Sequence, residues 1–222
     1  MCFSATASFT LAGALVPVGA YAMARARGHN RAWLPFAVFP LAFGIQQAFE
    51  GLVWLGVEGD NASMVSVGSH GFLFFSHFFW LAWVPFAAWR IESDPRRKRI
   101  MGVLTVIGFL YGLSIFLPAF LSTEGLKIEV IQRSLEYRTM LIYEDVIPRA
   151  ILRVFYAVIV VAALFLSTDR RIQVFGGLIL VSLLLTYAFF AYAFISVWCF
   201  FAAVLSAYLA VVIHADARRV AA

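Results

Sequence analysis

The clearest indication of the fold is the stretch IQVFGGLILVSLLLTYAFFAYAFISVWCFFAAVLSAYLAVVI, residues 172–213, whose 42 residues include no proline and no charged side chain. A single α-helix of that length would measure about 63 Å, roughly twice the ~30 Å thickness of a bilayer's hydrocarbon core. The stretch therefore predicts two membrane-spanning helices joined by a turn near Ala191–Phe194.

The rest of the chain has the same apolar character. Of its 222 residues, 63% are hydrophobic and 13% are charged, whereas soluble domains carry about 45–50% apolar and about 25% charged residues. These values exclude a disordered chain, a collagen, a disulfide scaffold and a soluble enzyme.

Seven ranges have the length that a membrane span requires. They are residues 5–24, 33–56, 64–89, 100–121, 147–167, 172–191 and 194–214. Backbone groups in lipid must satisfy one another's hydrogen bonds, so each range is expected to be helical. We therefore predict one all-α integral membrane domain over residues 1–222, folded as a bundle of seven transmembrane helices.

The basic residues predict the orientation of this bundle. Twelve of the 17 lysines and arginines lie in segments that would share one side: Arg25, Arg27, Arg31, Arg90, Arg96, Arg97, Lys98, Arg99, Arg170, Arg171, Arg218 and Arg219. An excess of Lys and Arg marks the cytoplasmic side, so the N-terminus is expected outside and the C-terminus inside. The net charge of +5 is therefore explained by contact with a bilayer, and no nucleic-acid partner is expected.

One polar segment, about residues 123–146, separates the fourth and fifth predicted spans on the outer side. Polar and apolar residues alternate in Lys127-Ile128-Glu129-Val130 and again in Leu135-Glu136-Tyr137. Such alternation predicts a short β-hairpin. It would act either as a lid over the helices or as a solvated loop.

A few polar side chains interrupt the predicted spans, and they are the candidate functional residues. At 1.5 Å per residue, four helices each place one such side chain ~7–9 Å from the outer surface: Glu50, His70, Arg153 and Cys199. Gln46 and Gln47 precede Glu50 by about one helical turn, and His77 lies two turns deeper than His70. Ionisable residues inside a membrane are costly and usually functional.

Three interpretations of this group remain open. Cys2, Glu50, His70 and His77 could bind a transition metal, either zinc, copper or iron, because thiolate, carboxylate and imidazole are its ligands. Alternatively, Glu50, His77 and the two glutamines could line a proton or solute conduit, with Arg153 as the counter-charge. In the third interpretation, Glu50 pairs with Arg153 or His70 and only fixes the helix packing. None of the three determines whether the protein is an enzyme.

Two cofactors are not expected. A retinal Schiff base requires a lysine within a span, and the only lysines are Lys98 and Lys127, both in loops. A haem held by two histidines requires them on two helices at one level, but His70 and His77 share a predicted helix.

The fourth span contains the pattern G-x-x-x-G at Gly108 and Gly112. Small residues at this spacing let two helices approach closely. The pattern predicts either a homo-oligomer formed through this helix or close packing within one chain.

Two segments resemble a known family. The chain begins Met1-Cys2-Phe3-Ser4-Ala5, and its second span contains FGIQQAFEGLVW at residues 43–54. Both are similar to segments of an uncharacterised family of bacterial membrane proteins, best over the first hundred residues. The resemblance implies a multi-pass protein of the bacterial inner membrane, and it implies no activity.

Overall fold

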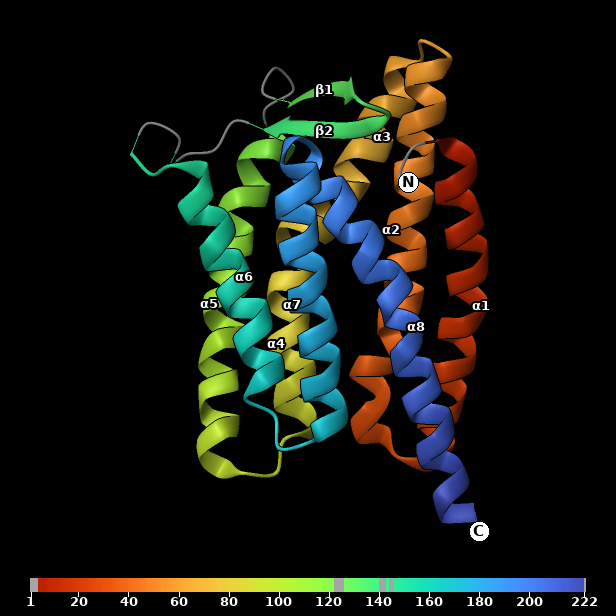
Figure 1. The fold of residues 1–222 in the computed structure, drawn as a ribbon, viewed down its shortest axis with the longest axis vertical. Coiled ribbons are helices and arrows are strands. Elements are labelled where there is room, and N and C mark those ends of the chain that lie inside the picture. Colours follow the sequence, from red (N-terminus) through yellow and green to blue (C-terminus); the bar gives the residue numbers. More distant parts are fainter. Residues whose placement is uncertain (1–3, 122–125, 140–142, 144–145, 222) are drawn as a thin grey trace.

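The computed structural model describes residues 4–121, 126–139, 143 and 146–221. The elements along the chain are α1 (Ala5–His29), η1 (Arg31–Trp33), α2 (Leu34–Glu58), α3 (Ala62–Leu73), η2 (Phe74–Phe79), α4 (Trp80–Ile91), α5 (Pro95–Leu121), β1 (Leu126–Ile131), β2 (Ser134–Thr139), α6 (Arg149–Phe165), α7 (Arg170–Phe190), η3 (Ala191–Ala193) and α8 (Phe194–Ala221). The long helices lie side by side in an up-and-down bundle, with the hairpin at the end where the chain begins (Figure 1).

The predicted all-α fold is confirmed, and its helices are compatible with a multi-pass membrane protein. Within the described ranges, five segments are long and apolar enough to cross a membrane: Ala5–His29, Arg31–Glu58, Ala62–Ile91, Pro95–Leu121 and Arg170–Arg218. The third of these combines α3, η2 and α4, and the fifth combines α7, η3 and α8.

The turn predicted near Ala191–Phe194 is confirmed. The segment Arg170–Arg218 is 49 residues long, and the three-residue element η3 interrupts it at Ala191–Ala193. Helices α7 and α8 therefore run back along each other (Figure 1). Length alone required this break, because an uninterrupted helix would extend far beyond the bundle.

Polar side chains cap several helices where the apolar runs begin. Ser4 accepts a hydrogen bond from the backbone N–H of Ala7 at the start of α1. Asn61 does the same for Met64 in α3, and Asp169 for Arg171 in α7. These side chains satisfy backbone donors that have no partner inside the helix.

The outer surface of the bundle is apolar over much of its height. On α5, Val106 and Leu110 are each 59% exposed, and Leu121 is 73% exposed. A soluble protein rarely exposes a continuous row of large aliphatic side chains. The surface is typical of one that contacts lipid.

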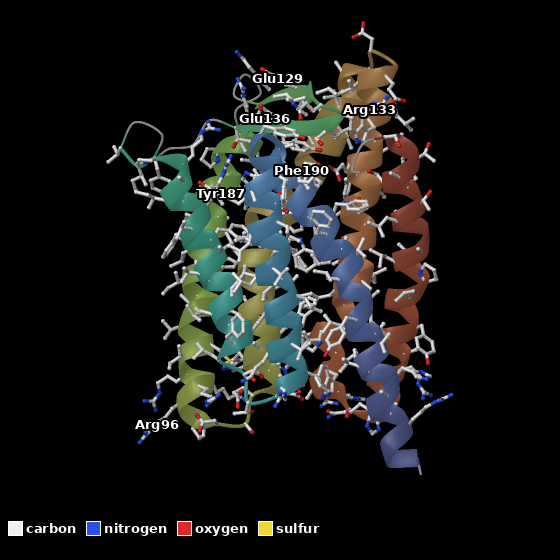
Figure 2. All side chains as sticks on the ribbon, in the orientation of Figure 1. Arg96, Glu129, Arg133, Glu136, Tyr187 and Phe190 are labelled. Atoms are coloured by element: carbon white, nitrogen blue, oxygen red, sulfur yellow. The ribbon has the colours of Figure 1, made fainter. Side chains whose placement is uncertain are left out.

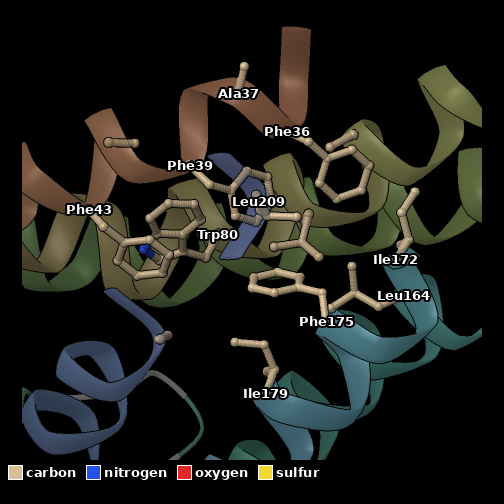
Figure 3. Close-up of a cluster of buried hydrophobic side chains, with 14 of the residues drawn as sticks. Phe36, Ala37, Phe39, Phe43, Trp80, Leu164, Ile172, Phe175, Ile179 and Leu209 are labelled. Carbon is tan, nitrogen blue, oxygen red and sulfur yellow. The ribbon is translucent and has the colours of Figure 1, made fainter. Parts of the chain in front are cut away.

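Aromatic side chains fill the centre of the bundle (Figure 3). Phe43 of α2 stacks on Trp80 of α4, with 3.8 Å between ring centroids. Phe39 of α2 meets the edge of Phe175 of α7 at 5.9 Å. Since these rings come from three helices, they fix the helices' relative positions.

The G-x-x-x-G pattern of α5 is used within the chain. A Cβ on Gly108 would lie 2.0 Å from the carbonyl oxygen of Leu81 in α4, and one on Gly112 would lie 3.0 Å from the Cα of Phe78 in η2. These glycines let α5 approach α4 and η2 closely. A homo-oligomer formed through α5 would therefore have to use another face of this helix.

The hairpin predicted from the alternating residues is confirmed. Strands β1 and β2 pair antiparallel, and Ile131 faces Ser134 across a turn of two residues, Gln132 and Arg133. Both turn residues have positive φ, 46° and 62°, as in the type I′ turn that suits a two-residue hairpin. Of the predicted segment, residues 123–125, 140–142 and 144–145 lie outside the described residues.

Candidate functional site

A cavity of about 100 Å³ lies between strand β2 and the helix ends beneath it. Residues from η2, α5, α6, η3 and α8 form its walls. Strand β2 covers it, since Leu135 and Tyr137 are buried and the Tyr137 ring stacks on Phe72 of α3 at 4.7 Å. The hairpin thus closes over the polar end of the bundle, which is the position expected of a lid.

The element η2 contributes Ser76 and His77 to the cavity. This segment is a π-helix, whose turns are wider than those of an α-helix and are frequent at functional sites. Both side chains are buried, and the Ser76 Oγ lies 3.0 Å from the His77 Nδ1. The irregular turn places two consecutive polar side chains in an otherwise apolar helix.

Helix α6 contributes two arginines one turn apart. Arg149 donates a 2.9 Å hydrogen bond to the carbonyl oxygen of Thr139, which ties α6 to β2. The Arg153 guanidinium lies 5.2 Å from the centroid of the Phe194 ring, within cation–π range. In the part of the chain that the structure describes, no carboxylate lies within 4.0 Å of Arg153.

The acidic side chain at the cavity already has a cationic partner. Glu136 of β2 lines the cavity, and its Oε2 lies 3.1 Å from the Nη2 of Arg138. Arg138 also reaches Glu129 on the neighbouring strand, at 3.5 Å. Arg138 is exposed on the hairpin, so Glu136 has a cationic partner outside the cavity, which it shares with Glu129.

Aromatic residues complete the lining with neutral polar groups. Tyr111 of α5 donates a 3.0 Å hydrogen bond to the carbonyl oxygen of Leu152. Tyr156 of α6 meets the Trp198 ring edge-on at 5.6 Å. Trp198 is 8% exposed, and its Nε1 has no hydrogen-bond partner among the described residues. The lining residues therefore include an indole whose buried N–H has no acceptor among the described residues.

The sequence interpretation did not include these aromatic residues. Tyr111 lies one position before Gly112, and Tyr156 follows Arg153 by three positions on the same helix. Helical spacing from Arg153 could have indicated Tyr156. In the sequence, Trp198 is typical of the aromatic residues that lie at a membrane interface, and this position does not distinguish it as a site residue.

Glu50 forms a separate buried cluster below the cavity. Its Oε1 accepts a 2.5 Å hydrogen bond from the Ser196 hydroxyl of α8, and its Oε2 accepts a 3.0 Å bond from Gln47. The neighbouring Gln46 accepts a 2.7 Å bond from the Trp80 indole. Glu50 and both glutamines are fully buried. The cluster joins α2 to both α8 and α4.

Cys199 lies between the cavity and this cluster. It lines the cavity, and the polar groups near its thiol include Gln46 and Glu50. Cys199 on α8 thus shares the cavity with Arg153 on α6 and lies near Glu50 on α2, whereas Glu50 does not line the cavity.

His70 lies apart from this group. Its Nδ1 is 2.7 Å from the carbonyl oxygen of Ser66 in the same helix, and its ring packs edge-on against Phe120 at 5.8 Å. Neither His70 nor Arg153 forms an ion pair with Glu50 among the described residues. The packing ion pair considered from the sequence is thus replaced by the hydrogen bonds of Ser196 and Gln47.

The structure describes three of the four predicted metal ligands, Glu50, His70 and His77. Cys2 lies outside the described residues. Within the described ranges, no group of three or more His, Cys, Asp or Glu side chains gathers around a point that could hold a metal ion. The metal centre therefore stays a prediction from the sequence.

Comparison with curated proteins and with solved structures gives no match. The model of a family of unknown function, DUF6629, matches residues 1–222. This agrees with the resemblance carried by the first residues and by the glutamine-glutamate helix. The chain belongs to this family of unknown function, DUF6629.

Proposed function

We propose that the protein is an integral membrane protein that binds a small organic anion in the cavity beneath the hairpin. The observation that carries the proposal is the pair of arginines in the cavity wall, Arg149 and Arg153. Arg153 has no carboxylate of the described residues within 4.0 Å. A cation in a largely apolar setting is costly unless an anion balances it.

The chemistry of the lining suits a carboxylate or a phosphate. A guanidinium presents several N–H donors in a planar fork that matches the oxygens of these groups. The Trp198 indole N–H has no partner in the described chain, and a small rotation of its ring would offer it as a further donor. Tyrosine hydroxyls from two helices add neutral contacts. Electrostatic attraction is stronger here than in water, because the surroundings have a low dielectric constant.

The depth of the cavity favours binding over conduction. The polar lining ends at Trp198 and Cys199, and beyond it the centre of the bundle is lined by apolar and aromatic side chains that include Phe39, Trp80 and Phe175 (Figure 3). A polar site that ends inside the protein suits a bound ligand. A conduit would require polar groups on both sides of this aromatic layer.

We also propose that all seven predicted ranges cross the inner membrane, with the hairpin and the N-terminus outside. The hairpin residues Glu129, Arg133 and Glu136 lie at one end of the bundle, and Arg96 lies at the other (Figure 2). Most of the lysines and arginines lie at the end of the bundle that contains Arg96. By the positive-inside rule, this end is the cytoplasmic one. An impermeant amine reagent applied to sealed inner-membrane vesicles of known orientation should therefore label Lys98 and Lys127 from opposite faces.

Thermal unfolding of the purified protein in detergent tests the anion site. We expect benzoate to raise the melting temperature and the neutral analogue benzamide to leave it unchanged. Arg153→Gln should abolish the effect of benzoate. Arg96→Gln, which removes an exposed arginine at the opposite end of the bundle, should preserve it. Equal shifts with benzoate and benzamide, or an undiminished shift in Arg153→Gln, would refute the proposal.

One observation favours a second candidate, a transition-metal centre that uses Cys199 in place of the predicted ligands Cys2, Glu50 and His70. His77 and Cys199, an imidazole and a thiol, both line the cavity, and these are ligand types for zinc, copper and iron. Elemental analysis of the purified protein tests this candidate. A stoichiometric metal that is lost in Cys199→Ala supports it, and metal-free protein contradicts it.

A further inference from the structure

A second, smaller cavity of about 40 Å³ lies next to the polar one. Three residues line both: Tyr156, Trp198 and Cys199. The remaining lining residues of this inner cavity are almost all apolar and come from α2, α4, α6, α7 and α8. We call the two spaces the outer cavity and the inner cavity.

We propose that the two cavities form one binding site for an amphiphilic anion, a carboxylate that carries one aromatic ring or a short branched chain. This inference rests on the proposed anion site and adds the class of ligand. The anionic group would lie in the outer cavity near Arg153. The apolar group would pass Trp198 and reach the inner cavity.

The inner cavity is more apolar than the outer one. The outer cavity combines charged and hydroxyl-bearing side chains with apolar ones such as Ile115 and Leu152. In the inner cavity, the side chains beyond the shared residues include Phe43, Val160 and Ala202. An apolar cavity of this kind stays free of water and accepts apolar groups. A ligand that fills both spaces must therefore be charged at one end and apolar at the other.

The volumes limit the size of the ligand. A cavity of about 150 Å³ lined by aliphatic and aromatic side chains binds benzene. The outer and inner cavities, at about 100 and about 40 Å³, are together close to that size. The branched end of 3-methylbutanoate is small enough to enter the inner cavity, and the ring of benzoate would extend from the outer cavity into the inner one, so both are suitable probes. A long-chain fatty acid is too large. Filling a void as large as the inner cavity should strengthen binding about fivefold.

The experiment compares acetate, 3-methylbutanoate and benzoate as ligands of the full chain, by calorimetry in detergent. The wild type should bind the two larger anions at least fivefold more tightly than acetate. Val160→Leu reduces the inner cavity and should weaken this preference. Val160→Ala enlarges it and should shift the preference towards a longer carboxylate such as hexanoate. Val204→Leu, on the exposed face of α8, is the matched control and should bind like the wild type.

The two Val160 variants keep the test independent of stability. Damage to the fold would weaken all ligands alike, whereas a change of cavity size moves the preference of the two variants in opposite directions. If binding depends on Arg153 but acetate binds as well as benzoate, the amphiphile inference is wrong while the anion site stands. If none of these anions binds, both proposals are wrong.

Discussion

Ser196 donates a 2.5 Å hydrogen bond to Glu50, joining α8 to α2 between residues that are 146 positions apart in the chain. The second oxygen of the Glu50 carboxyl accepts a bond from Gln47, within its own helix. Ser196 therefore supplies the contact that connects Glu50 to another element. In a fully buried setting, such a bond is worth more than on a surface, because a lost partner cannot be replaced by water.

Ser196→Ala should lower the free energy of unfolding by about 1–3 kcal/mol, since it removes a donor from a buried carboxyl group. Ser206→Ala is the matched control. Ser206 is equally buried on α8, but its hydroxyl donates to the carbonyl oxygen of Ala203 in the same helix. Thermal unfolding in detergent should show a clear loss for the first variant and a small one for the second. Equal losses of stability in the two variants would mean that the hydrogen bond between α8 and α2 stabilises the fold no more than a bond within one helix.

The sequence predicted Glu50 as a candidate but could not predict Ser196 as its partner. Helical spacing placed Gln47 on the face of Glu50, because residues three apart on a helix are neighbours. A partner on another helix depends on how the helices rotate and pack, which spacing along one helix does not determine. For the same reason, His70 was grouped with Glu50 by depth alone, although its ring lies against Phe120.

The fold itself was more predictable than the site, because it depends on local patterns. The length of the apolar run required the break at Ala191–Ala193, and alternation in sequence predicted the hairpin. The cavity required tertiary information, since its walls come from six elements. The π-helical turn places His77 in the wall of the cavity, and the apolar residues around it follow the same sequence pattern as an ordinary α-helix.

Gly108→Ala should destabilise the protein by about 1–3 kcal/mol, the usual effect of overpacking. The added Cβ would lie 2.0 Å from the carbonyl oxygen of Leu81, a backbone atom that cannot rotate away. Gly177→Ala is the matched control on α7, where nothing lies within 4 Å of the added Cβ. That variant should be more stable than the wild type by about 0.5–1 kcal/mol, because alanine favours a helix. A stable Gly108→Ala would contradict the close packing of α5 on α4.

The hairpin turn should accept a better turn sequence. Gln132 and Arg133 both have positive φ, which asparagine and glycine adopt more easily than longer side chains. The double variant Gln132→Asn, Arg133→Gly should therefore slow amide hydrogen exchange in β1 and β2. Gln132→Val, with a β-branched residue at positive φ, should accelerate it. Mass spectrometry of the peptides spanning residues 126–139 measures the exchange rates of both variants. Faster exchange in the double variant and slower exchange in Gln132→Val would exclude this turn geometry.

Glu92 ties together two loops at the end of the bundle opposite the hairpin. Its Oε1 accepts hydrogen bonds from the backbone N–H groups of Ser93 and Asp94, each at 2.9 Å. Thr168, in the turn between α6 and α7, donates through its backbone N–H to Oε2 at 2.7 Å and through its hydroxyl to Oε1 at 2.9 Å. Burial by itself would raise the pKa of Glu92, but the hydrogen bonds from Asp94, Thr168 and Ser93 outweigh it and hold the pKa below its usual value of 4.5.

The sign of the pH effect follows from this direction. A carboxyl group with a lowered pKa in the folded state stabilises the fold above its unfolded pKa, and this stabilisation is lost as the pH falls through the folded value. The wild type should therefore lose stability as the pH falls below about 4.5. Glu92→Gln should be less stable near neutral pH by about 1–3 kcal/mol, since one acceptor oxygen becomes an amide nitrogen. The stability of Glu92→Gln should also depend less on pH in the acid range.

Some pH dependence should persist in this variant, because Asp169 also has a lowered pKa. Hydrogen bonds from Arg171 to Asp169 outweigh the effect of burial. Unfolding curves measured from about pH 7 to about pH 3 check this, and parallel curves for wild type and variant would show that Glu92 does not stabilise the fold through its charge.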